Sequence, residues 1–184
     1  MDKVILVEPE IPENTGFTAR LAANFNADIR IVNPEFNLSE ARKTASSCQE
    51  KLRNAEIYET LEEAIKDLDF VVGTKPGKGI ELEKFTPRKN TSLVVGRESS
   101  GLSNEELEKC DAVVHIETGE YSSINQSHAA AILMHSVNTR KEEKTEIKQL
   151  KALENELGEK TIELLKRASP TKEELNAVIG DIKE

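Results

Sequence analysis

The side chains of this sequence that could do chemistry are concentrated in four loops, each directly after a short apolar run. The first loop contains Asn14 and Arg20, the second is the glycine-rich segment 73–79, the third covers residues 96–103 and the fourth covers residues 117–128. Glycines let a backbone approach a ligand closely, and amide, hydroxyl and guanidinium groups can orient it by hydrogen bonds. The four loops are therefore our candidates for ligand binding.

Each of these loops also has a simpler explanation when it is taken alone. Asn14 can cap a helix, and segment 73–79, which lacks the spacing of a phosphate-binding loop, can be a flexible connection. An ion pair between Arg97 and Glu98 can do no more than fix a turn. The serines and asparagine in 117–128 can cap the apolar helix that follows them.

Several well-known catalytic patterns are missing from the sequence. It contains neither the dinucleotide-binding pattern G-x-G-x-x-G nor the hydrolase pattern G-x-S-x-G, which argues against both enzyme classes. His115, His128 and His135 lack the spacing of a metal site, so we expect structural or interface roles for them and no bound metal. Cys48 and Cys110 are expected to be small buried apolar residues without a disulfide, as is typical of the reducing cytosol.

The apolar runs are short and alternate with helical patterns, which predicts an α/β fold with a parallel sheet covered on both faces by helices. The expected strands are 4–7, 29–32, 55–58, 70–73, 93–96 and 112–116. Capping-box patterns predict helix starts at Thr60 with Glu63 and at Ser103 with Glu106. Ligands bind beyond the carboxyl ends of the strands in open parallel sheets, where the four loops should lie.

Length and charge narrow the range of partners. The chain has 184 residues with 34 acidic and 25 basic side chains, which gives a formal net charge of −9. A nucleic-acid binder that relies on diffuse attraction needs a net basic surface, so this class is disfavoured, whereas a local basic patch is not. No apolar run approaches the ~18 residues of a membrane span, and we expect neither a membrane anchor nor a signal peptide.

The composition changes after Val137. The remaining chain is rich in charged residues and has helical patterns but no strand candidate, and a third capping box joins Thr171 to Glu174. We therefore expect a main domain over 1–140, a charged helical linker over 141–160 and a small helical extension over 161–184.

Three of the four loops together resemble the sequence motifs of the SPOUT-class RNA ribose 2′-O-methyltransferases, in their TrmH-like branch. The matching segments are Asn14-x-Gly16-x-x-x-Arg20, Gly96-Arg97-Glu98-x-x-Gly101-Leu102-Ser103-Asn104-Glu105-Glu106-Leu107 and Tyr121-Ser122-Ser123-Ile124-Asn125. Three motifs in this order are far more specific than any one of them. The tail segment 167–175 is similar to the helical extension of the TrmJ subgroup, although the linker is short for it. Gln126 stands where an apolar residue is common in the family.

The resemblance implies a deep trefoil knot in the C-terminal part of the sheet, a homodimer, and S-adenosylmethionine bound in a bent shape within the knot. The residues that it implies for cofactor binding are Thr74, Lys75, Pro76, Gly96, Glu98, Gly101, Ile116, Ser122, Ser123 and Ile124. Glu98 is expected to hold a turn or Arg97 rather than to act as a base.

The resemblance also implies a cytoplasmic tRNA 2′-O-methyltransferase that acts on the anticodon-loop nucleotide at position 32, a cytidine or also a uridine. Its implied catalytic residues are Arg20, Asn14, Ser123 and Asn125. We expect RNA contacts from Arg20, Arg42, Lys43, Lys78, Arg88 and Arg97. Two alternatives stay open: methylation of ribosomal RNA or of another tRNA position, and an RNA-binding homologue that has lost the activity.

Overall fold

The computed structural model describes residues 1–139. The expected linker (141–160), the helical extension (161–184) and the capping box at Thr171 lie outside the described residues. The division of the chain into these parts therefore stays a prediction.

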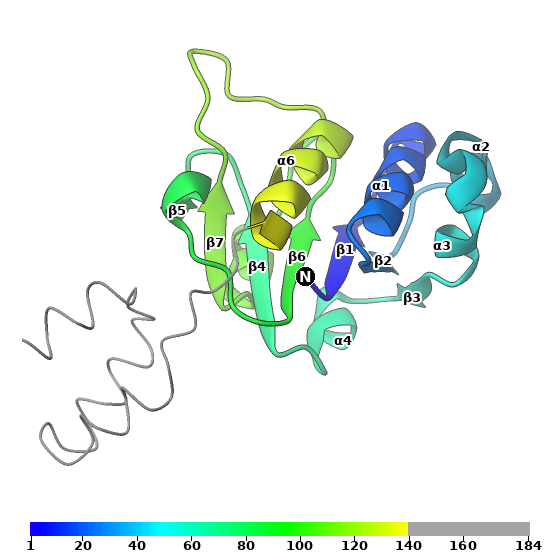
Figure 1. Ribbon diagram of the computed structural model, residues 1–184, viewed down its shortest axis with the longest axis horizontal. Helices are drawn as coiled ribbons and strands as arrows, with labels where there is room; N and C mark the ends of the chain where they lie inside the picture. The colour runs from blue at the N-terminus through cyan, green and yellow to red at the C-terminus, as the bar shows by residue number, and fades with distance from the viewer. Residues whose placement is uncertain (140–184) are drawn as a thin grey trace, which may run out of the picture. The chain divides into compact units, whose positions relative to one another are not determined.

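Seven parallel strands form one sheet in the described part of the chain, in the order β3-β2-β1-β6-β4-β7-β5 (Figure 1). The strands are β1 (Lys3–Val7), β2 (Asp28–Val32), β3 (Glu56–Tyr58), β4 (Phe70–Thr74), β5 (Ile80–Glu81), β6 (Thr91–Val95) and β7 (Ala112–His115). All six expected strands are confirmed. The sequence did not predict β5, because two residues are too few to produce a recognisable pattern.

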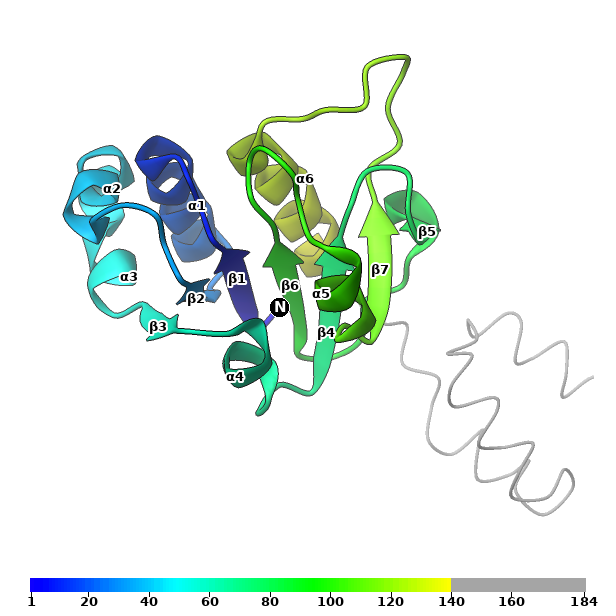
Figure 2. The same ribbon diagram turned by 180° about the vertical axis from the view of Figure 1, so that it is seen from behind.

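Helices cover both faces of the sheet, as Figures 1 and 2 show from opposite sides. One apolar layer packs α1 (Pro12–Asn24), α2 (Leu38–Ala45), α3 (Gln49–Arg53) and α6 (Gln126–Thr139) on the face formed by Val4 and Leu6 of β1. The other layer packs α4 (Leu61–Ile65) and α5 (Asn104–Glu108) on the face formed by Ile5 and Val7. Alternate residues of one strand thus serve two cores, which explains the continuous apolar run.

The helix starts agree with the expected capping in two cases and differ in a third. Ser103 accepts from the Glu106 backbone N–H at 3.1 Å and the Glu106 carboxylate accepts from Ser103 N–H at 2.7 Å, a complete capping box. Thr60 accepts from Glu63 N–H at 3.3 Å, so the helix start is as expected, but only this half of the predicted capping box is formed. The expected cap at Asn14 is wrong: α1 begins at Pro12, whose fixed φ suits a first helical position, so Asn14 lies inside the first turn.

Gly16 belongs to a helix contact. A Cβ at this position would lie 1.9 Å from Thr44 Oγ1 and 2.3 Å from the Ala41 carbonyl oxygen of α2. In the first motif, the position between Asn14 and Arg20 is therefore restricted to glycine by the packing of α1 against α2. Among the described helices, none is long and apolar enough to cross a membrane.

Candidate cofactor pocket and catalytic network

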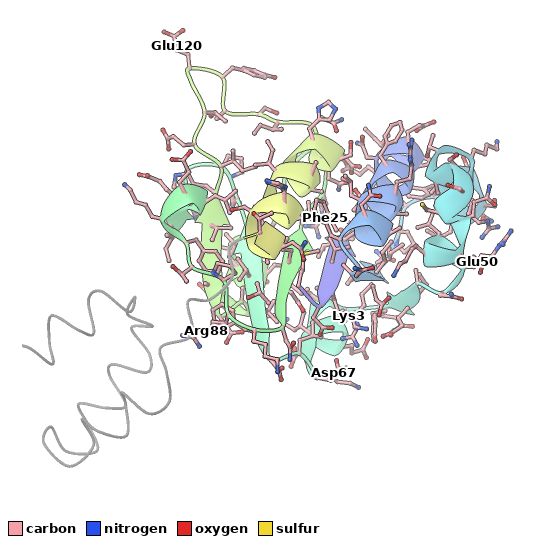
Figure 3. All side chains as sticks on the ribbon, viewed as in Figure 1. Lys3, Phe25, Glu50, Asp67, Arg88 and Glu120 are labelled. Carbon is pink, nitrogen blue, oxygen red and sulfur yellow. The ribbon has the colours of Figure 1, made fainter. Side chains whose placement is uncertain are left out.

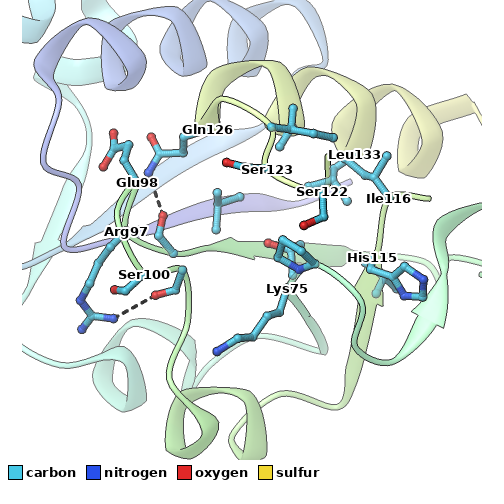
Figure 4. Close-up of a pocket in the computed structure, with 18 of the residues that line it drawn as sticks. Lys75, Arg97, Glu98, Ser100, His115, Ile116, Ser122, Ser123, Gln126 and Leu133 are labelled. Atoms are coloured by element: carbon cyan, nitrogen blue, oxygen red, sulfur yellow. Dashed lines mark hydrogen bonds between the residues drawn. The ribbon is translucent and has the colours of Figure 1, made fainter. Parts of the chain in front are cut away.

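A pocket lies at the carboxyl ends of β4, β6 and β7 (Figure 4). Its volume is about 330 Å³, within the range of small-molecule sites. All ten residues that were expected to bind the cofactor line it: Thr74, Lys75, Pro76, Gly96, Glu98, Gly101, Ile116, Ser122, Ser123 and Ile124. Three loops far apart in the sequence are therefore brought to one cavity, although their contact with a cofactor stays a prediction.

The sequence interpretation missed the apolar wall of this pocket. Val95 and Val114 are the last or nearly last residues of β6 and β7, and Ala129 and Leu133 lie one turn apart on α6. A strand-end position and an i, i+4 spacing could have indicated them. Gln126 was also missed: its side chain is 6% exposed, and Nε2 donates to the Gly96 carbonyl at 2.8 Å, which ties the start of α6 to the pocket loop (Figure 4).

The loop after β6 turns sharply at two glycines for different reasons. Gly101 has a φ of +67°, a conformation that favours glycine, and open space where a Cβ would lie. At Gly96 a Cβ would be 2.3 Å from the Gly101 carbonyl carbon and 2.4 Å from Leu102 N. The Lys75 ammonium donates to the Leu102 carbonyl at 2.6 Å and holds the loop from the side of β4.

Arg97 has a structural role in this loop, and the expected ion pair between Arg97 and Glu98 is wrong. Arg97 Nη1 and Nη2 donate to the two oxygens of Glu106 at 3.0 Å each, and Nε donates to Glu8 at 2.6 Å. These bonds, with Glu106 first and Glu8 second, raise the pKa of the Arg97 guanidinium. Because two carboxylates offset its charge, we interpret Arg97 as structural rather than as an RNA contact.

Glu98 holds the loop that precedes α1. Its Oε2 accepts from Glu10 N–H at 2.8 Å, and its Oε1 accepts from Ile11 N–H at 3.3 Å and from Asn14 Nδ2 at 3.2 Å. The second sequence motif is thereby joined to the first. Glu98 lines the pocket as expected, but its carboxylate already accepts three hydrogen bonds from the neighbouring loop.

Asn125 connects the third motif to the same network. Its Nδ2 donates to Asn14 Oδ1 at 3.0 Å, and Asn14 is only 4% exposed. Its Oδ1 accepts from Ser127 N–H at 3.0 Å and from Ser127 Oγ at 2.8 Å. Asn125 therefore caps α6, as its simpler explanation predicted, and also contacts Asn14.

Arg20 and Ser123 form no hydrogen bond with this network within residues 1–139. Arg20 is exposed on α1, six residues after Asn14, which corresponds to about 9 Å along the helix axis. Within residues 1–139 the Arg20 guanidinium has neither a hydrogen-bond nor an ion-pair partner. Ser123 is exposed and lines the pocket. The guanidinium is thus available to a substrate anion.

The other basic residues that were expected to bind RNA are spread over the surface. Arg42 and Lys43 lie in the last turn of α2, and Lys78 Nζ donates to Asn104 Oδ1 at 2.6 Å. Arg88 does not join the site: its guanidinium lies 4.4 Å from the centre of the Phe70 ring, where β4 begins. Figure 3 shows Arg88 at the opposite end of the molecule from Glu120, in the loop after β7.

The histidines and cysteines have ordinary surroundings. His115 lines the pocket, and its Nδ1 lies 3.1 Å from the Lys78 carbonyl oxygen. Cys48 and Cys110 are free and half-buried rather than fully buried as expected. Burial, followed by Asp111 and Glu106, raises the pKa of the Cys110 thiol to about 12. No group of three or more metal-binding side chains is found among residues 1–139.

Comparisons with known proteins identify a family that covers most of the described residues. Residues 2–135 match the SpoU rRNA Methylase family. A tRNA (cytidine-2'-O-)-methyltransferase TrmJ of Methanocaldococcus jannaschii is 39% identical over 77% of this chain and 69% of its own length. A tRNA (cytidine/uridine/adenosine-2'-O-)-methyltransferase TrmJ of Pseudomonas aeruginosa is 33% identical over 73% of this chain and 59% of its own length. The match thus covers only 59% to 69% of the length of these two relatives.

Solved structures show the same fold. The structure of TrmJ from Z. mobilis has a TM-score of 0.68 and 23% identity, and the match covers 100% of this chain and 98% of that one. The methyltransferase AviRb from Streptomyces viridochromogenes, solved in complex with AdoMet, has a TM-score of 0.65 and 22% identity over 74% of this chain and 58% of its own.

Proposed function

This chain belongs to the SpoU rRNA methylase family, and from that premise we propose that it methylates the ribose 2′-oxygen of the tRNA nucleotide at position 32, with S-adenosylmethionine as the methyl donor. The observation that carries the proposal is the hydrogen-bonded series Glu98–Asn14–Asn125, which joins all three motifs beside the pocket. The relatives named TrmJ support tRNA as the substrate.

The pocket residues fit the proposed cofactor. The backbone comes close to the cavity at Gly96, where a Cβ would overlap the opposite part of the loop, and apolar side chains from β6, β7 and α6 supply a dry wall. Such a site suits a ligand with one flat apolar group and several polar groups. S-adenosylmethionine, when bound, supplies an electrophilic methyl group on a sulfonium.

Arg20 is the proposed catalytic residue. Its guanidinium, which has no partner among the described residues, can bind a phosphate of the substrate in bidentate geometry and stabilise negative charge that develops on the attacking 2′-oxygen. A guanidinium stays protonated, so the hydroxyl proton leaves to that phosphate or to water. Asn14 and Asn125, which hold each other, and Ser123 at the pocket edge orient the ribose, so the geometry lowers the entropic part of the barrier.

The proposed RNA surface is formed by Arg20, Arg42, Lys43 and Lys78. Because the net charge of −9 repels a polyanion, binding must depend on these local basic side chains rather than on diffuse attraction. We expect modest tRNA affinity that falls steeply with salt, and an affinity independent of salt would contradict the surface.

A homodimer is the proposed assembly. The neighbouring helices α1 and α6 lie on one face of the sheet (Figure 1). Phe17 on α1 is 42% exposed and Ile132 on α6 is 43% exposed. A second copy that covers these side chains would remove apolar area from water. The trefoil knot is proposed for the segment around α6, and it is supported by the bond between Gln126 and Gly96. Light scattering of Ile132→Glu against the native chain tests the dimer.

The proposed function is tested by mapping methylated riboses on tRNA and ribosomal RNA from a deletion strain and from the same strain with the gene restored. Restoration of the methyl group at position 32 supports the proposal. Restoration elsewhere in tRNA or in ribosomal RNA favours the first alternative. If no site is restored and calorimetry detects no binding of millimolar S-adenosylmethionine, the chain is an RNA-binding homologue without activity.

A further inference from the structure

We propose that Glu10 is a positioning residue for the cofactor pocket, an inference that rests on the proposed function. Its carboxylate holds Ser99, which lines the pocket: Oε2 accepts from Ser99 N–H at 2.9 Å and Oε1 accepts from Ser99 Oγ at 2.6 Å. Both oxygens thus bind one residue of the loop after β6. A serine fixed at its backbone and its hydroxyl cannot rotate or move without breaking a charge-assisted bond.

Glu10 can hold this loop because its own segment is firmly anchored. Pro9 is buried, and its carbonyl accepts from Glu35 N–H at 3.2 Å, while Glu8 N–H donates to the Val32 carbonyl at 2.8 Å. The Glu10 backbone N–H in turn donates to Glu98 at 2.8 Å. Residues 8–11 and 97–99 are thereby bridged in both directions, from backbone to carboxylate each time.

The two carboxylates of this bridge face different parts of the site. Glu98 reaches Asn14 and, through it, Asn125, which belong to the proposed catalytic side. The Glu10 carboxylate forms hydrogen bonds with Ser99 alone among the described residues, on the cofactor side. Loss of the Glu10 carboxylate should therefore weaken cofactor binding and leave the alignment of Asn14 and Asn125 in place.

The test is methylation of saturating tRNA at varied S-adenosylmethionine, together with calorimetry of S-adenosylhomocysteine, for Glu10→Ala, Glu10→Gln and Ser99→Ala. We expect Glu10→Ala to raise KM and the dissociation constant about tenfold with kcat changed by less than about twofold, since hydrogen bonds to a charged acceptor have this order of strength. Ser99→Ala keeps the bond from the Ser99 backbone N–H to Glu10, so KM and the dissociation constant should rise less than in Glu10→Ala.

Glu10→Gln separates hydrogen bonding from charge. A glutamine oxygen can accept from Ser99 N–H while its amide nitrogen donates to Ser99 Oγ, so affinity should return to within about threefold of the native chain. An equal loss in Glu10→Gln and Glu10→Ala would overturn the positioning role in favour of direct attraction between the carboxylate and the cationic cofactor.

Glu35→Ala is the matched control, because it removes an exposed carboxylate from the neighbouring loop, keeps the backbone N–H that donates to Pro9, and should leave KM unchanged. A native KM in Glu10→Ala, or a fall in kcat instead of a rise in KM, would contradict the inference. Thermal unfolding of each variant checks that it is folded. If the native chain itself binds no cofactor, the proposed function fails, which is a different outcome from a native chain and a Glu10→Ala variant that bind equally.

Discussion

Asn125 and Asn14 are joined side chain to side chain at 3.0 Å, although 111 residues separate them in the sequence. The bond has a defined direction. Glu98 can only accept, so Asn14 must turn Nδ2 toward it and Oδ1 toward Asn125, whose own Oδ1 faces Ser127. The orientation of both amides thus follows from one carboxylate, and this direction can be tested by single-atom changes.

Replacing Asn125 by aspartate should separate the two roles of this residue. Aspartate caps a helix as well as asparagine does, so the melting temperature of Asn125→Asp should stay near the native value. Its carboxylate would face Asn14 Oδ1 without a proton to share, and we expect methyl transfer to fall at least about tenfold. Asn125→Ala should lose activity and also about 1 kcal/mol of stability. Thermal unfolding and single-turnover rates provide the comparison, and equal activity of Asn125→Asp and the native chain would show that the amide contact is dispensable.

Arg20→Ala should lower the single-turnover rate by at least about a hundredfold, the usual loss when one stabilising group for developing charge is removed. The single-turnover rate of Arg20→Lys should lie between those of the native chain and Arg20→Ala, because an ammonium keeps the charge but lacks the bidentate geometry. Lys66→Ala, an exposed cation next to the last turn of α4, is the control. A native rate in Arg20→Ala with unchanged RNA binding would remove Arg20 from the catalytic centre and direct attention to Glu98→Gln.

The two glycines of the pocket loop should respond differently to alanine. Gly96→Ala places a methyl group within 2.4 Å of backbone atoms that cannot rotate away, so the loop must move and cofactor binding should be lost. Gly101→Ala meets open space and incurs only the strain of a positive φ, on the order of 1 kcal/mol. Calorimetry of S-adenosylhomocysteine measures both variants, and tight binding by Gly96→Ala would mean that the loop is more adaptable than this packing indicates.

The ion pair between Arg30 and Asp67 predicts the response to acid. Arg30, 3% exposed on β2, donates to the two Asp67 oxygens at 2.6 and 2.8 Å, and these bonds hold the pKa of Asp67 at about 2, below its ordinary 3.8. A lowered pKa stabilises the fold above about pH 4, and this contribution disappears as the pH falls from about 4 through 2. Asp67→Asn should lower the melting temperature by a few degrees at about pH 6. The difference from the native chain should shrink toward about pH 2, and a constant difference would contradict the pairing.

The sequence predicted the strands and the pocket loops well because both depend on local pattern. Continuous apolar runs are produced by a strand buried on two faces, and in a parallel sheet all carboxyl ends lie at one edge. The predicted strands therefore imply that the three loops after them lie at the same edge of the sheet, at residues 74–76, 96–101 and 116–124. The short β5 was not predicted, because it is defined by its pairing with β7 and its two residues form no recognisable strand pattern.

The partners of individual side chains could not be predicted in the same way. Arg97 bonds to Glu8 and Glu106 rather than to the adjacent Glu98, because the turn between Gly96 and Gly101 directs neighbouring side chains to different loops. The role of Glu10 could not be predicted, because it depends on a contact with Ser99 that exists only in the folded chain. Arg88 precedes the amino end of β6, whereas the pocket lies at the carboxyl ends of the strands, and a basic residue type alone does not distinguish the two ends.

The order of the strands has a consequence for how the chain forms during synthesis. Of the described strands β1 is synthesised first, yet only one of its two neighbours, β2, follows closely in the sequence, whereas the other, β6, begins at Thr91. Until the whole of β6 has left the ribosome, one edge of the apolar strand β1 carries unpaired backbone N–H and C=O groups, which can recruit strands from other molecules. Folding of the nascent chain therefore waits for a long-range contact, and aggregation competes with it most strongly during that interval.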